Sequence, residues 1–192
     1  MTERRKEKFL SVLRHRQPNL TVVLEDIHDP HNVSAILRSA DAVGILEVQL
    51  VYTSDEFPTL GKKSSASAKK WVGHREFGSI RECYAKLYEE GFVILATHLG
   101  KRTQSLYELD LTRKVALVFG NEHRGVSAEA AKLANGNFHI PMVGMIESLN
   151  VSVACAVSLY EAFRQRQAIG CGTLMNPDAV QKMFEEWIKT KR

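Results

Sequence analysis

The sequence lacks several features that would place it in a specialised class of protein. It has only three cysteines, Cys83, Cys155 and Cys171, and their odd number and spacing fit neither a disulfide framework nor a Cys-x-x-Cys zinc site. No run approaches the ~18–20 apolar residues of a membrane span, and no apolar segment follows the charged N-terminus. We therefore expect a soluble protein of the reducing cytoplasm that has no membrane partner.

Two glycine-rich nucleotide signatures are also missing. No Gly-x-Gly-x-x-Gly occurs anywhere in the chain, and no Lys-Ser or Lys-Thr follows Gly125, where a phosphate-binding loop would need one. A doubly wound nucleotide-binding domain therefore remains only as an alternative.

What is present indicates one compact domain with a local excess of positive charge. The 192 residues are 44% hydrophobic and 25% charged, with 26 Lys and Arg against 22 Asp and Glu. Basic residues gather in segments 1–16 and 62–75, so the placement of the charge is more informative than its size.

Short β-branched runs alternate with helical patterns, which is typical of an α/β fold with a mostly parallel sheet flanked by helices. The expected strands are Leu20–Glu25, Val48–Tyr52, Phe92–Ala96, Val115–Phe119 and Phe138–Ile140. The expected helices are Asp29–Val43, Ile80–Glu90, Ser127–Ala134, Asn150–Gln167 and Pro177–Lys191.

Three segments could carry chemistry, and the first is 29–44, which follows the first expected strand. Asp29 can cap this helix and Pro30 suits its first position. An apolar stripe would pack on the sheet, so Arg38 points away from it, toward solvent or a ligand. Asn32 lies in the first turn beyond the strand, where open parallel sheets bind ligands.

Two histidines and two aspartates near this helix start raise a metal site as an alternative. They are Asp26, His28, Asp29 and His31. A turn at a strand end does not aim four neighbouring side chains at one point, and Asp29 already has a capping role. We expect no metal.

The second segment, 115–127, is an apolar strand that runs into a turn bounded by Gly120 and Gly125. Glycines at these positions let the backbone approach a flat ligand closely, and Glu122 offers a hydrogen-bond acceptor.

The third segment, 140–156, is an apolar loop that leads into a helix of small residues. Loops are normally polar, so this one must be covered by a ligand, by another chain segment or by a partner subunit. Ser148 and Asn150 bracket the helix start, where either side chain can cap the backbone. The apolar loop residues are Met142, Val143, Met145, Ile146 and Leu149.

Together the segments resemble the three motifs of the SPOUT superfamily of RNA methyltransferases, most closely the TrmH family, which methylates ribose 2′-hydroxyls. The motifs read Asn32-x-x-Ala35-x-x-Arg38-x-x-Asp41-x-x-Gly44, Phe119-Gly120-x-Glu122-x-x-Gly125 and Ile140-Pro141-Met142-x-Gly144-Met145-x-x-Ser148-Leu149-Asn150-Val151-Ser152. The similarity extends from Arg16 to Gln167. Within the family, the chain is most like members that modify a D-loop guanosine of tRNA.

The resemblance implies a SPOUT methyltransferase domain at residues 18–170 whose C-terminal part forms a trefoil knot. It also implies S-adenosylmethionine as methyl donor, tRNA as partner and a homodimer. With tRNA as partner, the basic segments supply the candidate RNA-binding residues, which are Arg4, Arg5, Lys6, Lys8, Arg14, Arg16, Lys62, Lys63, Lys69 and Lys70. A basic helical extension, 1–17, would precede this domain. An amphipathic helix, 171–192, would follow it, with Asn176 as its cap.

The resemblance also assigns roles to residues. Arg38 would be the catalytic arginine and Asn32 would hold the active-site turn. The polar members of the second and third motifs would be Glu122, Ser148 and Asn150. Backbone lining the adenosine would lie around Thr97, Gly120, Ile140 and Leu149. A guanidinium is a poor general base, so we expect Arg38 to hold phosphate and stabilise the 2′-oxyanion.

Two other functions stay open at this point. One is ribose methylation of ribosomal RNA, and the other is RNA binding by a knotted protein that transfers no methyl group. Both Arg38 and Asn150 are present, which favours the enzyme.

Overall fold

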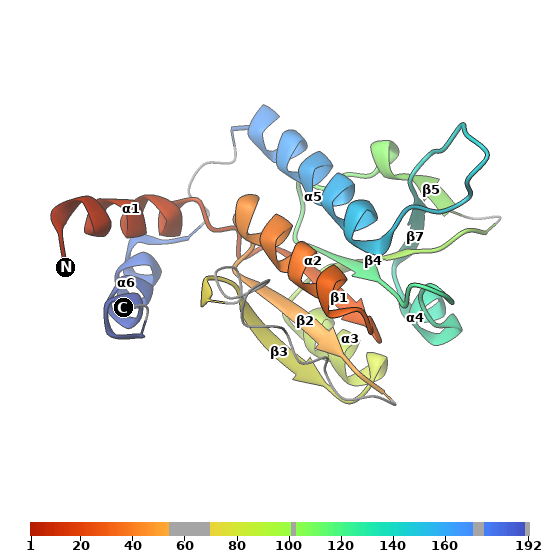
Figure 1. Cartoon of the computed structure of the whole chain (residues 1–192), viewed down its shortest axis with the longest axis horizontal. Coiled ribbons are helices and arrows are strands. Elements are labelled where there is room, and N and C mark those ends of the chain that lie inside the picture. Colours follow the sequence, from red (N-terminus) through yellow and green to blue (C-terminus); the bar gives the residue numbers. More distant parts are fainter. Residues whose placement is uncertain (54–69, 101–102, 171–174, 191–192) are drawn as a thin grey trace.

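The computed structural model describes residues 1–53, 70–100, 103–170 and 175–190. Within these ranges, seven strands form one sheet in which every pairing is parallel, in the order β3-β2-β1-β6-β4-β7-β5 (Figure 1). The strands are β1 (Leu20–Glu25), β2 (Glu47–Val51), β3 (Gly73–Phe77), β4 (Val93–Thr97), β5 (Thr103–Ser105), β6 (Val115–Phe119) and β7 (Gly136–His139).

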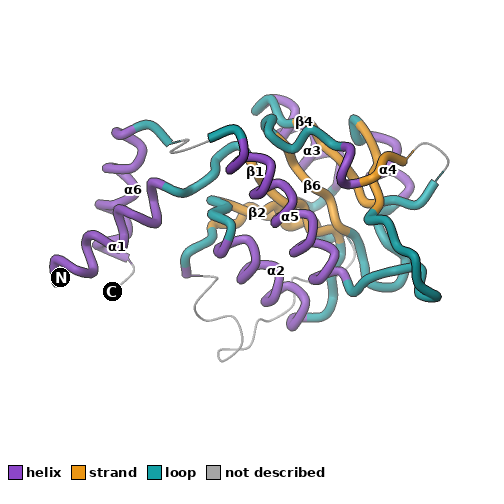
Figure 2. The backbone as a smooth tube through the Cα atoms, turned by 90° about the horizontal axis from the view of Figure 1, so that it is seen from above, coloured by secondary structure: helices purple, strands orange, loops and turns teal. Residues whose placement is uncertain are grey.

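Helices cover both faces of the sheet. On one face α2 (Pro30–Ala42) packs beside α5 (Val151–Ala168), as Figure 2 also shows. On the other face lie α3 (Ile80–Glu89) and the short α4 (Ala128–Leu133). The central strands β1 and β6 are buried along their whole length because both of their faces are covered. The predicted α/β class with a parallel sheet is confirmed.

Two strands, β3 and β5, were not predicted from the sequence, and both lie at edges of the sheet. β3 reads Gly-His-Arg-Glu-Phe and is mostly exposed or half-buried, so it has no apolar run that marks it as a strand. β5 is three residues long and pairs only with β7 among the described strands. A short 3₁₀ turn, Leu106–Glu108, follows it.

The chain ends form a separate helical pair. α1 (Glu3–Arg14) packs against α6 (Pro177–Thr190), away from the main sheet (Figure 1). As predicted, α6 buries an apolar face, and the side chain of Asn176 accepts a hydrogen bond from the backbone N–H of Ala179 at 2.7 Å. The small core between the two helices includes Phe9, Leu13, Phe184 and Trp187, with Trp71 packed against it.

Arg16 connects this helical pair to the main domain. Its side chain is fully buried, where it donates hydrogen bonds to Asp41 Oδ1 at 2.7 Å, to the carbonyl of Ile45 at 2.9 Å and to that of Trp71 at 3.0 Å. Its guanidinium also lies over the Trp187 ring, 5.7 Å from the centroid. The prediction that Arg16 contacts RNA is therefore wrong, because burial keeps this cation from any phosphate.

Two cysteines fall within the described residues, and both are buried free thiols. Burial raises the pKa of the Cys83 thiol to about 12 and also raises that of Cys155. Both side chains therefore stay protonated near neutral pH and act as small apolar groups of the two sheet faces.

We predict that Arg16→Lys lowers the free energy of unfolding by about 2–4 kcal/mol, because an ammonium cannot reach the three acceptors that the planar guanidinium serves. Urea denaturation of the whole chain measures the change. Arg14→Lys, on the exposed side of α1, is the matched control and should stay within about 0.5 kcal/mol of the wild type. Equal effects of the two substitutions would contradict this assignment.

Candidate active site

Three polar side chains from separate segments meet at the carboxyl ends of β1 and β6. Asn32 Nδ2 donates to Glu122 Oε1 at 3.0 Å, and Asn150 Nδ2 donates to Asn32 Oδ1 at 3.1 Å. Because β1 and β6 are parallel neighbours, the helix that follows β1 and the turn that follows β6 begin at the same edge. One residue from each of the three predicted motifs therefore joins a single hydrogen-bonded chain.

Besides the hydrogen bond from Asn32, the Glu122 carboxylate accepts two from the backbone. The backbone N–H groups of Asp29 and His28 point at its two carboxylate oxygens, at 3.2 and 3.4 Å. Burial raises the pKa of Glu122, but the hydrogen bonds from Asn32 and from these backbone amides outweigh it and leave the pKa below its ordinary value. The carboxylate is thus ionised at the positive end of α2, where it is stabilised by the helix dipole.

The starts of the two helices are fixed by side-chain caps. Asp29 Oδ1 accepts from the N–H of His31 at 2.8 Å, as predicted, and Pro30 is the first residue of α2. At the start of α5 the cap is Asn150, whose Oδ1 accepts from the N–H of Ser152 at 2.9 Å. Capping therefore explains Asn150 rather than Ser148, which lies exposed in the preceding loop.

Arg38 lies six residues after Asn32 on α2, about 9 Å along the helix axis. Its side chain is exposed, on the side away from the apolar stripe that packs on the sheet, as the spacing predicts. The structure thus places a cation on the same helix as the polar group at the strand ends.

The turn after β6 closes on itself. A Cβ at Gly120 would lie 2.2 Å from the backbone of Gly125, and Gly125 itself has a φ of +69°. Asn121 completes the turn, because its side chain donates to the carbonyl of Asp26 at 2.8 Å while its own carbonyl accepts from Gly125 N–H at 2.9 Å. The two glycines are needed because the backbone at position 120 packs directly on the backbone at position 125. The turn then directs the Glu122 side chain toward Asn32.

Asp26, which the sequence suggested only as an alternative metal ligand, has a structural role at this edge of the sheet. Its φ is +49°, a left-handed conformation that is uncommon for an aspartate. Its buried carboxylate accepts from the N–H and hydroxyl of Thr53, each at 2.9 Å, and forms a 2.8 Å ion pair with Arg124. Among the described residues, no group of three or more His, Cys, Asp or Glu side chains is placed to hold a metal ion.

The residues predicted to surround the adenosine lie at the ends of three adjacent strands. Thr97 ends β4, Gly120 follows β6 and Ile140 follows β7, while Leu149 directly precedes the cap of α5. Thr97 Oγ1 donates to the carbonyl of Val118 at 2.9 Å, which links β4 to β6 beside this site. All four positions therefore gather at one end of the sheet.

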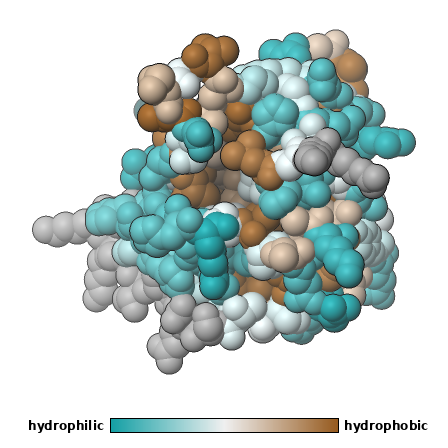
Figure 3. All heavy atoms as spheres, turned by 90° about the vertical axis from the view of Figure 1, so that its right-hand side faces the viewer, coloured by the Kyte–Doolittle hydropathy of each residue, from teal (hydrophilic) through white to brown (hydrophobic). Residues whose placement is uncertain are grey.

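The loop between β7 and α5 exposes large apolar side chains, as its composition predicts. Val143 and Met145 are fully exposed and Ile146 is 64% exposed. Figure 3, which views the molecule from the side of β5 and β7, shows hydrophobic residues gathered around a hollow on this face. Val153 and Tyr160 on α5 are exposed as well.

Apart from the buried Arg16, the predicted RNA-binding residues divide into three groups. On α1, the exposed ones are Arg4, Arg5, Lys6, Lys8 and Arg14. Lys70 is half-buried, with its ammonium 5.6 Å from the centroid of the Trp71 ring. Lys62, Lys63 and Lys69 lie outside the described residues.

Comparison with known proteins defines the class. The SpoU rRNA Methylase family matches residues 19–160, so the chain belongs to this family of RNA methylases. The tRNA (guanosine(18)-2′-O)-methyltransferase of Thermus thermophilus is 45% identical over 98% of this chain and 97% of its own length.

Solved structures agree with this assignment. A TrmH/SpoU tRNA modifying enzyme of Aquifex aeolicus superposes with a TM-score of 0.89 at 35% identity, over 96% of this chain and 95% of its own. The SpoU methyltransferase AviRb of Streptomyces viridochromogenes, solved with the cofactor AdoMet, superposes with a TM-score of 0.71 at 25% identity, over 79% of this chain and 62% of its own.

We predict that the contribution of Glu122 to stability is constant above about pH 5 and is lost in acid. A carboxylate whose folded pKa is lowered stabilises the fold above its unfolded pKa, and that stabilisation disappears as the pH falls through the folded pKa. Urea denaturation of the wild type and Glu122→Gln from pH 3 to 8 measures the difference. A difference that changes between pH 6 and 8 would contradict the lowered pKa.

Proposed function

We propose that this protein transfers a methyl group from S-adenosylmethionine to the ribose 2′-hydroxyl of a D-loop guanosine in tRNA. The observation that carries this function is the hydrogen-bonded chain of Glu122, Asn32 and Asn150, in a sequence 45% identical over 98% of its length to a tRNA (guanosine(18)-2′-O)-methyltransferase. Each of the three residues comes from a different predicted motif.

The proposed donor site consists of Thr97, Gly120, Ile140 and Leu149. It suits S-adenosylmethionine because the Gly120–Gly125 turn presents backbone without a side chain, and the neighbouring loop offers apolar surface. When bound, S-adenosylmethionine supplies a methyl group made electrophilic by the attached sulfonium. A relative solved with this cofactor supports the assignment. The proposed chemistry needs no metal ion.

Arg38 is the proposed catalytic residue. A guanidinium stays protonated at neutral pH, so it serves as an electrostatic group that holds an RNA phosphate and stabilises negative charge on the 2′-oxygen. The proton of the hydroxyl then passes to water or to a substrate phosphate, because the Glu122 carboxylate is already held by Asn32 and two backbone amides.

Asn32, Glu122 and Asn150 are proposed to fix the geometry around the acceptor ribose. Their hydrogen bonds tie the starts of α2 and α5 to the turn after β6, and in-line transfer depends on such positioning. Ser148 is exposed two residues before Asn150, where its hydroxyl can meet the substrate.

The proposed tRNA surface includes the exposed cations of α1 together with Lys70 and the lysines at positions 62, 63 and 69. The exposure of five cations on one short helix supports this role.

We also propose a homodimer. The apolar side chains that the loop 141–149 and α5 expose need a cover, and a second copy would supply it.

The C-terminal half of the domain at residues 18–170 is proposed to be a trefoil knot. This is supported by the order of the strands, in which β7 lies between β4 and β5 while α5 returns to α2. The helical pair α1 and α6 has its own core, which supports treating 1–17 and 171–192 as extensions of that domain.

No helix among the described residues is long and apolar enough to cross a membrane. The proposed location of this tRNA-modifying enzyme is the cytoplasm.

We expect labelled methyl to pass from S-adenosylmethionine to an unmodified tRNA transcript, and Arg38→Ala to lower kcat about 10²–10³-fold. The affinity for S-adenosylmethionine, measured by calorimetry, should stay unchanged, because Arg38 acts on the acceptor. Arg81→Ala, an exposed arginine of α3, is the matched control and should keep full activity.

A transcript with 2′-deoxyguanosine at the D-loop position tests the acceptor in the same assay. Loss of incorporation assigns that hydroxyl. Incorporation that persists would place the target elsewhere in tRNA, and incorporation into ribosomal RNA alone would replace the substrate. No incorporation into either RNA would contradict the enzyme function.

Removing charge from α1 should weaken tRNA binding and its dependence on salt. The triple variant Arg4→Gln, Arg5→Gln, Lys8→Gln should reduce the slope of log affinity against log salt concentration by about 2–3. These substitutions spare Phe9 and Leu13, which hold α1 to α6. The control removes equal charge from α3 and α4, at Arg81, Lys86 and Lys132, and an identical slope in both variants would contradict the role of α1.

A further inference from the structure

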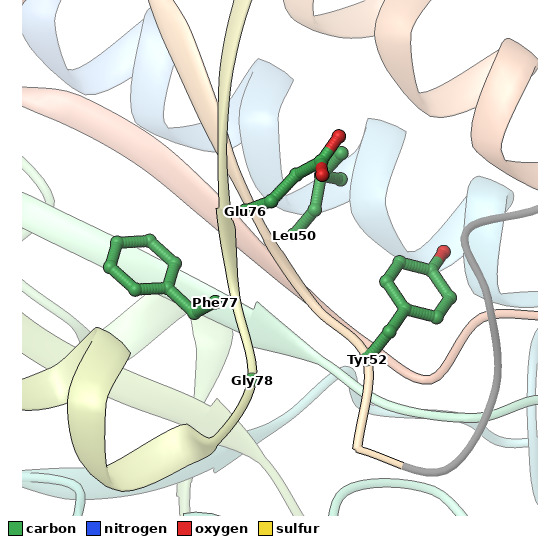
Figure 4. Close-up of a pocket in the computed structure, with 5 residues that line it drawn as sticks. All are labelled: Leu50, Tyr52, Glu76, Phe77 and Gly78. Atoms are coloured by element: carbon green, nitrogen blue, oxygen red, sulfur yellow. The ribbon is translucent and has the colours of Figure 1, made fainter.

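A cavity of about 260 Å³ opens at the carboxyl ends of β2 and β3, apart from the proposed donor site. It is lined by Leu50, Tyr52, Glu76, Phe77 and Gly78 (Figure 4). This volume lies just below the usual range for small-molecule sites, so the cavity suits one flat ring system. None of the five residues has a role in the function proposed above.

The pairing of β2 with β3 decides which side chains form the walls. In the parallel register Leu50 lies opposite Glu76, and side chains alternate along each strand, so Leu50, Tyr52 and Glu76 share the face of the sheet that α2 covers. Figure 4 shows these three on one side of the strands, with the Phe77 ring pointing away. The cavity therefore has an aliphatic floor and an aromatic wall, and at its open rim stands the Glu76 carboxylate, which is 63% exposed and lies 3.5 Å from His74 Nε2.

The cavity and the proposed donor residues lie on different sides of β1 in the strand order. The strand order places β6, β4 and β7, with the donor residues, on one side of β1, and β2 and β3 on the other. The polar group of Asn32 and Glu122 lies between them. Because methyl transfer needs the acceptor oxygen in line with the methyl group and the sulfur behind it, the acceptor nucleoside enters from the side away from the donor.

Tyr52 connects the cavity to the polar group. Its hydroxyl donates to the carbonyl of Ile27 at 2.8 Å, and the next residue, His28, gives its N–H to Glu122. Burial raises the pKa of Tyr52, and the negative charges of Glu122 and Asp26 raise it further, so the hydroxyl keeps its proton and its hydrogen bond. The ring is thereby fixed as a surface on which a base can stack.

Glu76 determines which base fits. It is the charged residue among the five, and an ionised carboxylate only accepts hydrogen bonds, so it repels a phosphate and favours a ring with N–H donors. Guanine presents two adjacent donors, N1–H and the N2 amino group, to the two oxygens of one carboxylate. Adenine presents an unprotonated N1 at the same place.

We propose that this cavity receives the base of the acceptor nucleoside, with Tyr52 stacked on it and Glu76 accepting from N1–H and N2–H of guanine. The inference rests on the proposed function, and it names the part of the protein that selects the nucleoside. The base would leave the RNA stack to enter, as bases do in enzymes that act on single nucleotides.

The test compares kcat/KM for methyl transfer to tRNA transcripts that carry guanosine, inosine or adenosine at the modified position. Inosine lacks only the N2 amino group, so the wild type should prefer guanosine over inosine about 10-fold. Glu76→Gln replaces one acceptor oxygen with a donor and should bring this ratio close to 1. Glu82→Gln, an exposed glutamate of α3, is the matched control and should keep the wild-type ratio.

A second variant fills the cavity. Gly78 lines it, and a Cβ added there meets no atom within 4 Å, so Gly78→Leu occupies the space without a backbone clash. We expect kcat/KM for the guanosine transcript to fall at least about 10-fold, with an unchanged Tm and unchanged affinity for S-adenosylmethionine.

The outcomes separate the two proposals. Transfer with the same guanosine preference in Glu76→Gln, or full activity of Gly78→Leu, would overturn the base cavity and leave the methyltransferase in place. Absence of transfer by the wild type to any tRNA would overturn the proposed function and this inference with it.

Discussion

The amide of Asn32 is the contact on which the arrangement of the site depends. Its NH₂ group donates to Glu122 and its oxygen accepts from Asn150. One side-chain amide thus joins α2 to segments that lie 90 and 118 residues further along the chain. An aspartate could accept from Asn150 but would face the Glu122 carboxylate with a second negative charge. A leucine would leave Glu122 and Asn150 without these partners at a buried position. The residue type therefore follows from the need to donate and accept within one small group.

Much of the fold could be predicted because its inner strands have recognisable apolar sequence patterns. β1 and β6 are covered on both faces, so β6 is apolar throughout and β1 is mostly aliphatic, and Asp29 with Pro30 marks the start of α2. β3 could not be found in the same way, because an edge strand with His74, Arg75 and Glu76 gains its hydrogen bonds from β2 while its side chains meet water. Pairing of this kind depends on a distant strand rather than on a local pattern.

Site residues could be predicted from the sequence where helical spacing determines their position. They could not be predicted where a normally exposed charged residue is buried by distant parts of the chain. The positions of Asn32 and Arg38 on α2 follow from helical periodicity. Glu122 and Asn150 were recognisable as an acceptor and a helix cap, and the resemblance to a family grouped them with Asn32 in one site. Arg16 lies in a basic segment and was therefore predicted to contact phosphate. In the structure, Asp41, the carbonyl of Trp71 and the Trp187 ring enclose its guanidinium. These partners lie between 25 and 171 residues away, so no local pattern in the sequence could reveal them. The cavity beside Tyr52 was hidden for the same reason, since it needs β3 as its second wall.

The charged edge at β3 also bears on how the protein behaves at high concentration. An edge strand offers unpaired backbone groups to other chains, and flat apolar edges join into intermolecular sheets. On β3, Arg75 forms ion pairs with Glu47 and Glu90, while the Glu76 side chain is 63% exposed and lies 3.5 Å from His74. A second strand that docked there would have to strip water from these charges. The edge should therefore resist fibril growth, and substitutions that make it apolar should turn a monodisperse preparation into one that aggregates on storage.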